Sequence, residues 1–140
     1  METPALQLLM HSSIVFLIAL LCGFPYGSAI VQKKSEETIR AWKLAHVSLS
    51  IGATTNFALA GVLSHLQVQE TIQWIIAIAF ISSAYGFTFS LSLEPMLSER
   101  GLSWSGTSAN KVVFVGNTIG AIGSLIGAIV LVYGAYRSLI

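Results

Sequence analysis

The stretch HSSIVFLIALLCG, residues 11–23, carries no charged side chain and lies in the middle of an apolar segment covering about residues 8–30. The apolar core of a bilayer is crossed by about 20 residues of helix. Three further segments are long and apolar enough, at about residues 38–66, 71–93 and 110–139. Strands are not expected, because alternation is absent and open sheet edges do not occur in lipid. The sequence predicts an all-α integral membrane protein, a four-transmembrane-helix bundle forming a single domain over residues 1–140.

Composition supports lipid as the surrounding medium. Only 9% of the 140 residues are charged and the mean hydropathy is +0.77, whereas a soluble domain carries about 25% charged residues. The net charge of +1 provides no basic patch for phosphates, so nucleic acid is not expected as a partner. The expected partner is membrane lipid.

The residues of familiar catalytic sets are missing. The chain has no aspartate, its six acidic residues are all glutamates, and its single cysteine is Cys22. A Ser-His-Asp set is therefore impossible, a cysteine metal cluster is excluded, and no glutamate lies in the middle of a span. If the protein is an enzyme, we expect a cofactor to supply the difficult chemistry.

The loops predict an orientation in the membrane. With four spans, the first and third loops lie on one side. These loops and their flanks hold Lys33, Lys34, Arg40, Lys43, Arg100 and Lys111, whereas the other side holds only Arg137. Cytoplasmic loops carry an excess of lysine and arginine, so both termini are expected on the non-cytoplasmic side.

The fourth span has a glycine face. Gly116, Gly120, Gly123, Gly127 and Gly134 follow one another at spacings of four, three, four and seven, which places them on one side of a helix. Small residues at such spacing let membrane helices approach closely. The partner could be another span of this chain or a second copy, and the sequence alone leaves both open.

His46, in the second span, is the sharpest candidate for chemistry, because ionisable groups within spans are rare. Neutral imidazole is a common ligand of metals and of haem iron. Trp42 and Ser50, four residues before and after it, lie on the same helical face. A histidine that only forms a hydrogen bond between helices is the alternative interpretation, and His11 in the first span allows the same two.

Several short motifs together resemble one family. In chain order they are His11 opening an apolar run to Gly23, Trp42-Lys43-Leu44-Ala45-His46, Gly86-Phe87, and Arg100-Gly101-Leu102 followed by Ser103, Trp104 and Asn110-Lys111. This set is similar to the styrene oxide isomerase family of small four-span membrane proteins. The resemblance covers most of the chain.

The resemblance implies a cofactor, an assembly and a reaction. Family members are homotrimers that bind haem b near protomer interfaces, and the histidine of the Ala-His pair is the axial ligand, here His46. Trp42 and Ser50 are then expected beside the cofactor. Ferric haem acts as a Lewis acid that isomerises a small hydrophobic epoxide to a carbonyl compound, the Meinwald rearrangement.

The catalytic positions depart from the family pattern. The asparagine expected six residues after the axial histidine is Gly52, and Asn56 is the nearest substitute. The tyrosine expected after Gly-Phe is Thr88, with Tyr85 close by, and the expected aspartate has no counterpart. The candidate catalytic residues are therefore Asn56, Tyr85 and Thr88.

Two other functions remain open from the sequence. The first is a glutathione-dependent membrane enzyme of the MAPEG type, which pairs an arginine-bearing helix with an Ala-His pair, here Arg40 and His46. The second is a non-catalytic membrane subunit or scaffold, in which both histidines only pack and the glycine face forms the interface.

Overall fold

The computed structural model describes residues 3–140, and these form four long α-helices joined by short loops. The helices are α1 (Thr3–Val31), α2 (Glu36–Leu63), α3 (Glu70–Leu97) and α4 (Ser108–Arg137). Each is long and apolar enough to cross a membrane, and the described residues contain no strand. The all-α, four-span prediction is confirmed, and the chain is a multi-pass membrane protein.

Two of the helices, α2 and α4, have a hydroxyl-bearing N-cap residue. The Oγ of Ser35 accepts a hydrogen bond from the backbone N–H of Thr38 at the start of α2, and Thr107 Oγ1 accepts one from Asn110 N–H at the start of α4. Such caps satisfy backbone donors that have no partner within the helix. They fix where α2 and α4 leave the loops.

The third span was expected to end at about residue 93, before Glu94-Pro95, but α3 is longer than this. It continues through Pro95 to Leu97, because a proline this close to the helix end removes only one of the last hydrogen bonds. The helix instead ends at Ser98, whose φ of 55° is left-handed and whose N–H donates to the Glu94 carbonyl. Similarly, Pro25 lies inside α1 without ending it.

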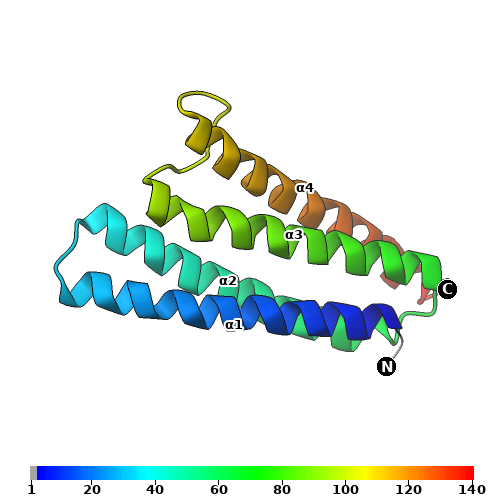
Figure 1. Cartoon of the computed structure of the whole chain (residues 1–140). Helices are drawn as coiled ribbons and strands as arrows, with labels where there is room; N and C mark the ends of the chain where they lie inside the picture. Colours follow the sequence, from blue (N-terminus) through cyan, green and yellow to red (C-terminus); the bar gives the residue numbers. More distant parts are fainter. Residues whose placement is uncertain (1–2) are drawn as a thin grey trace.

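The helices are arranged as two hairpins side by side (Figure 1). The α1–α2 hairpin packs against α3, and within the described residues α4 contacts α3 alone among the helices. The two chain ends lie at one end of the molecule, and the α1–α2 and α3–α4 loops lie at the other. Helices α2 and α4 therefore border α3 without meeting each other.

Small residues form much of the core between α1, α2 and α3. Fully buried alanines alternate with larger side chains such as Leu8, Leu49 and Leu63. These buried alanines are Ala5, Ala19, Ala45, Ala53, Ala60 and Ala77. Because lipid gives helices no hydrophobic drive to associate, close backbone approach along such residues holds the bundle together.

The glycine face of α4 packs within the chain, against α3. A Cβ on Gly120 would lie 2.7 Å from the Phe87 ring, and one on Gly127 would lie 2.9 Å from the Phe80 ring. The Ser83 hydroxyl donates a buried hydrogen bond to the Gly120 carbonyl at 2.7 Å. The question left open by the sequence is answered for this surface, whose partner is α3.

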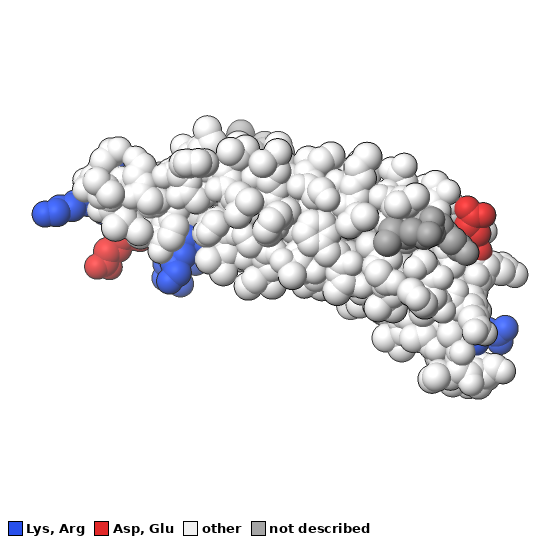
Figure 2. Space-filling view, turned by 90° about the horizontal axis from the view of Figure 1, so that it is seen from below, with Lys and Arg blue, Asp and Glu red and all other residues white. Residues whose placement is uncertain are grey.

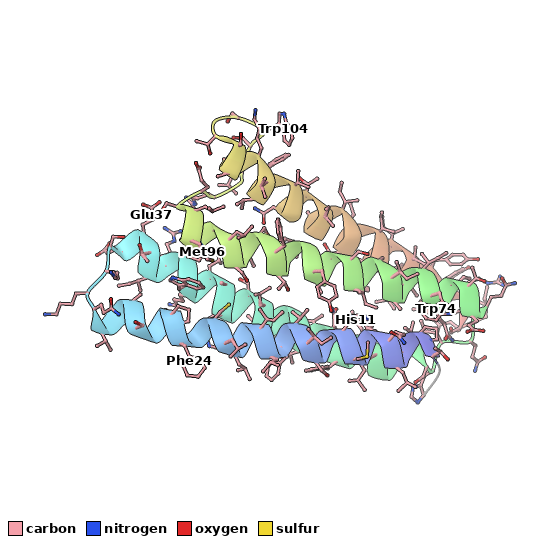
Figure 3. All side chains as sticks on the ribbon, viewed as in Figure 1. His11, Phe24, Glu37, Trp74, Met96 and Trp104 are labelled. Carbon is pink, nitrogen blue, oxygen red and sulfur yellow. The ribbon has the colours of Figure 1, made fainter. Side chains whose placement is uncertain are left out.

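The outer surface has the charge distribution of a membrane-spanning protein. Figure 2 shows coloured charged residues at the two ends of the molecule and an uncharged surface between them. Trp104 and Trp74 lie toward opposite ends (Figure 3), as expected of tryptophans at the two membrane interfaces. The outward side of α4 is apolar and exposed through Val115, Ile119, Ile122, Ile126 and Ile129.

Candidate functional site

His46 lies on the side of α2 that faces α1. Its Nδ1 is 2.8 Å from the backbone carbonyl oxygen of Ala19. A carbonyl oxygen can only accept, so Nδ1 carries the proton and donates. In the neutral ring, Nε2 then carries the lone pair. Within residues 3–140, no side chain forms a hydrogen bond with Nε2. Histidines that bind a metal commonly have this arrangement, with one ring nitrogen donating to a carbonyl and the other left for the metal.

Two residues of α1 shape the place where the imidazole lies. Gly23 lies directly beside the ring, since a Cβ there would be in van der Waals contact, 3.4 Å from both Cε1 and Nδ1 of His46. Tyr26 stacks beside it, with ring centroids 6.3 Å apart and an angle of 24° between the planes. The imidazole therefore has three neighbours on α1: the Ala19 carbonyl at Nδ1, Gly23 beside the ring atoms, and the Tyr26 ring stacked on it.

The two residues expected beside the cofactor lie near His46 but make contacts of their own. Trp42 packs against the buried cluster of Val15, Ala19 and Ala45. The Ser50 hydroxyl donates to the His46 backbone carbonyl at 2.7 Å, within the same helix. Their role toward a cofactor stays a prediction.

One histidine such as His46 could hold a haem iron but could not by itself form a structural zinc site. Within residues 3–140, no three His, Cys, Asp or Glu side chains come together as ligands. A structural zinc site needs four protein ligands, whereas haem iron is commonly held by one histidine on one side. Haem binding through Nε2 of His46 stays a prediction.

A separate cavity of about 510 Å³ lies over α3, between α2 and α4. Its walls are mostly apolar, with Phe80, Phe87 and Leu91 on the α3 side and Asn117 on the α4 side. Asn56 of α2 lines it, is only 5% exposed, and makes no side-chain hydrogen bond within residues 3–140. An apolar cavity with a few placed polar groups is typical of a small-molecule site.

The three candidate catalytic residues do not all reach this cavity. Only Asn56 lines it. The Tyr85 hydroxyl is 2.9 Å from His11 Nδ1, joining α3 to α1, and His11 lies between these helices in Figure 3. Thr88 is buried and donates to the Ala84 carbonyl of its own helix at 2.7 Å.

His46 does not line this cavity, although Ser48 and Leu49, two and three residues further along α2, do. Trp42 and Ser50 do not line it either, and His46 and Asn56 stand about 15 Å apart along the axis of α2. Sequence reasoning missed the partners that orient His46, the Ala19 carbonyl and Gly23. No signal in one sequence could have found them, because they depend on how α1 and α2 are aligned.

These features together define a small four-helix membrane protein with one oriented histidine in its second span and an apolar cavity beside the third. A family model described as styrene oxide isomerase matches residues 5–136. The chain belongs to this family, as its short motifs suggested. A comparison with curated proteins finds no match.

Proposed function

We propose that this protein is a haem-b-binding membrane isomerase that converts a small hydrophobic epoxide into a carbonyl compound. Membership of the styrene oxide isomerase family supports the class of reaction. The observation that supports the cofactor is the hydrogen bond from His46 Nδ1 to the Ala19 carbonyl, since it leaves the Nε2 lone pair with which His46 would hold the haem iron.

A bound ferric haem would supply a Lewis acid that draws electron density from the epoxide oxygen. The chain itself would hold and orient the two reactants. His46 would fix the iron on one side, and the apolar cavity would exclude water. Exclusion of water matters for an isomerisation, because water reaching the electron-poor carbon would give a diol instead of a carbonyl compound.

Asn56 is the group of this chain that can orient the substrate. The Asn56 residue is only 5% exposed, it borders the cavity, and its side chain makes no hydrogen bond within residues 3–140. Its amide N–H groups are therefore free to donate a hydrogen bond to an epoxide oxygen in the cavity. Tyr85 and Thr88 take a lesser part in this proposal, because the cavity does not include them.

Because His46 does not line the cavity of its own copy, we propose that several copies assemble to complete the site. One copy presents His46 toward α1 and its cavity between α2 and α4. A homotrimer, as the family resemblance implies, would place the His46 side of one copy beside the cavity of the next. The exposed apolar side of α4 is available for such contact.

The first test is the visible spectrum of detergent-purified protein supplied with haem. We expect a Soret band in the wild type and its loss in His46→Ala. The matched control is His65→Ala, because His65 is exposed and its Nδ1 also lies near a carbonyl, that of Gly61, at 2.9 Å. A wild type without the band, or tight glutathione binding in its place, would contradict the proposal.

The second test separates the reaction from cofactor binding. Asn56→Leu should keep the Soret band and lower kcat for an aryl epoxide by about 100-fold, the scale for removing one preorganised donor. Thr54→Val is the control, because Thr54 is exposed and bonds only within its own helix. Equal turnover in Asn56→Leu and wild type would remove Asn56 from the mechanism.

A further inference from the structure

A second, more polar cavity lies at the end of the molecule that carries the α1–α2 and α3–α4 loops. Its volume is about 480 Å³, and it is formed by the first turns of α2, the last turn of α3 and the residues just after it. Both signs of charge line it, through the arginines Arg40 and Arg100 and four glutamates, Glu36, Glu37, Glu94 and Glu99, beside apolar Leu44 and Pro95. The cavity for the proposed reaction shares none of these residues.

Glu94 is the most unusual residue of this cavity. It is a glutamate only 9% exposed, and it makes no side-chain hydrogen bond within residues 3–140. Its single ion contact is with Arg100 Nε at 4.0 Å, which is long for a charge-assisted hydrogen bond. Glu94 therefore has no cation within the distance of a charge-assisted hydrogen bond.

The two arginines of this cavity, Arg40 and Arg100, have N–H donors that could bind an anion. Arg100 is more than half exposed and its contact with Glu94 is the only ion pair within the described residues. Arg40 lines the same cavity from α2. The guanidinium group presents several N–H donors in a plane that suits phosphate oxygens. The cavity therefore offers sites for an anion and for a cation within one volume.

The location fits the headgroup layer of a membrane. The cavity lies where α2 begins and α3 ends, and Glu37 and Met96 are seen at this end of the molecule (Figure 3). Met96 is largely exposed and apolar. An acyl chain could follow Leu44 and Met96 toward the hydrocarbon layer while its headgroup stays among the charges.

We propose that this cavity binds a phosphoethanolamine group, in which a primary ammonium is joined to a phosphodiester. The ammonium donates to Glu94, and the phosphodiester accepts from Arg40 and Arg100. This pairing gives Glu94 the close donor it lacks and uses both guanidinium groups. It also assigns a role to Arg100, which opens the Arg100-Gly101-Leu102 motif. The proposal does not depend on haem.

Other headgroups match the cavity less well. A phosphoglycerol headgroup has the anion but no ammonium for Glu94. A phosphocholine headgroup has a cation, but its quaternary nitrogen has no N–H to donate. We therefore expect binding of phosphatidylethanolamine to exceed that of phosphatidylglycerol or phosphatidylcholine by about tenfold, the scale of one hydrogen bond to a charged group.

The experiment measures retention of each lipid by native mass spectrometry, with purified full-length protein and three lipids of identical acyl chains. A separate arm titrates soluble glycerophosphoethanolamine into the detergent-purified protein and follows its thermal unfolding. Preference for phosphatidylethanolamine alone identifies a membrane lipid, and stabilisation by the soluble compound as well identifies the headgroup as sufficient. Equal retention of all three lipids, with no response to the soluble compound, would overturn the proposal.

Substitutions in the cavity test whether it is the site that binds the lipid headgroup. Glu94→Gln and Arg40→Gln should each abolish the preference for phosphatidylethanolamine over phosphatidylcholine or reduce it about tenfold. Glu70→Gln is the control, because Glu70 begins the same helix at the opposite end of the molecule. If Arg40→Gln folds like the wild type and keeps the full preference, the cavity is not the site.

Discussion

At the scale of single residues, the proposed function depends on how the His46 imidazole is oriented. His46 donates through Nδ1 to a backbone carbonyl of another helix, and the same ring lies against Gly23 and Tyr26. If His46 only packed between helices, a hydrogen bond from either ring nitrogen to α1 would fulfil that role. The bond to Ala19 selects the nitrogen, and so it determines whether Nε2 can serve as a ligand.

The space beside the ring gives a prediction that leaves His46 itself unchanged. Gly23→Leu should displace the imidazole from the Ala19 carbonyl, because even a Cβ at this position reaches within 3.4 Å of the ring. Haem affinity should fall about 10- to 100-fold, as it does when residues that orient a metal ligand are changed. Haem titration followed by the Soret band measures the effect.

Gly27 provides the matched control, since it lies about one turn further along α1 and a Cβ there meets nothing within 4 Å. Gly27→Leu should bind haem as the wild type does. Loss of haem in both variants to the same extent would mean that leucine disturbs α1 in general and that Gly23 has no special relation to His46.

Sequence reasoning reached some of these residues and missed others for a physical reason. His46 could be recognised because a polar ring in an apolar span is costly wherever the neighbouring helices lie. Ala19 and Gly23 could not, because their role exists only in the alignment of α1 with α2. The same limit applies to Thr88, whose hydroxyl bonds within its own helix, and to Tyr85, which pairs with His11.

At the scale of helices, glycine spacing and hydropathy predicted much of the fold. Four apolar segments became four helices, and the glycines of α4 form a contact surface as their spacing indicated. What hydropathy could not provide was the identity of the surface opposite. Gly86 completes it from α3, where a single glycine gives no periodic signal.

The contact between α3 and α4 gives a prediction of stability. A Cβ on Gly86 would lie 2.7 Å from the backbone nitrogen of Gly120, and a backbone atom cannot rotate away as a side chain can. Gly86→Ala should therefore lower the free energy of unfolding by about 1–3 kcal/mol, the usual cost of overpacking. Thermal unfolding in detergent measures the change.

Gly61→Ala is the control for this prediction. Gly61 is also inside a helix, α2, but it is exposed and a Cβ there meets nothing within 4 Å. Because alanine is favoured over glycine in a helix, Gly61→Ala should unfold at the wild-type temperature or above it. A Gly86→Ala protein as stable as Gly61→Ala would show that the two helices can separate at no cost.

At the scale of the whole molecule, the layout is open on the side where α2 and α4 border α3. Because α4 contacts α3 alone among the helices, one copy leaves a cavity there and exposes apolar residues along α4. The sequence indicated that an oligomer was possible, but it could not show which surfaces remain uncovered. That information depends on the packing of all four helices.

The orientation of the molecule in the membrane is the final prediction. The α1–α2 and α3–α4 loops lie together at one end (Figure 1), and with their flanks they hold nearly all of the lysines and arginines. Positive loops are retained in the cytoplasm, so these two loops should face inward and the α2–α3 loop outward. The native Cys22 is buried, which allows a single introduced cysteine to report its side.

The measurement uses a membrane-impermeant maleimide on intact bacterial cells that express the protein. Gln67→Cys, in the exposed α2–α3 loop, should react before permeabilisation, whereas Ser105→Cys, in the exposed α3–α4 loop, should react only afterwards. The unmodified chain shows any background from Cys22. The reverse pattern would place both termini in the cytoplasm. The polar cavity of Glu94 and Arg100 lies with the α3–α4 loop, so this labelling also determines which leaflet supplies its phosphoethanolamine headgroup.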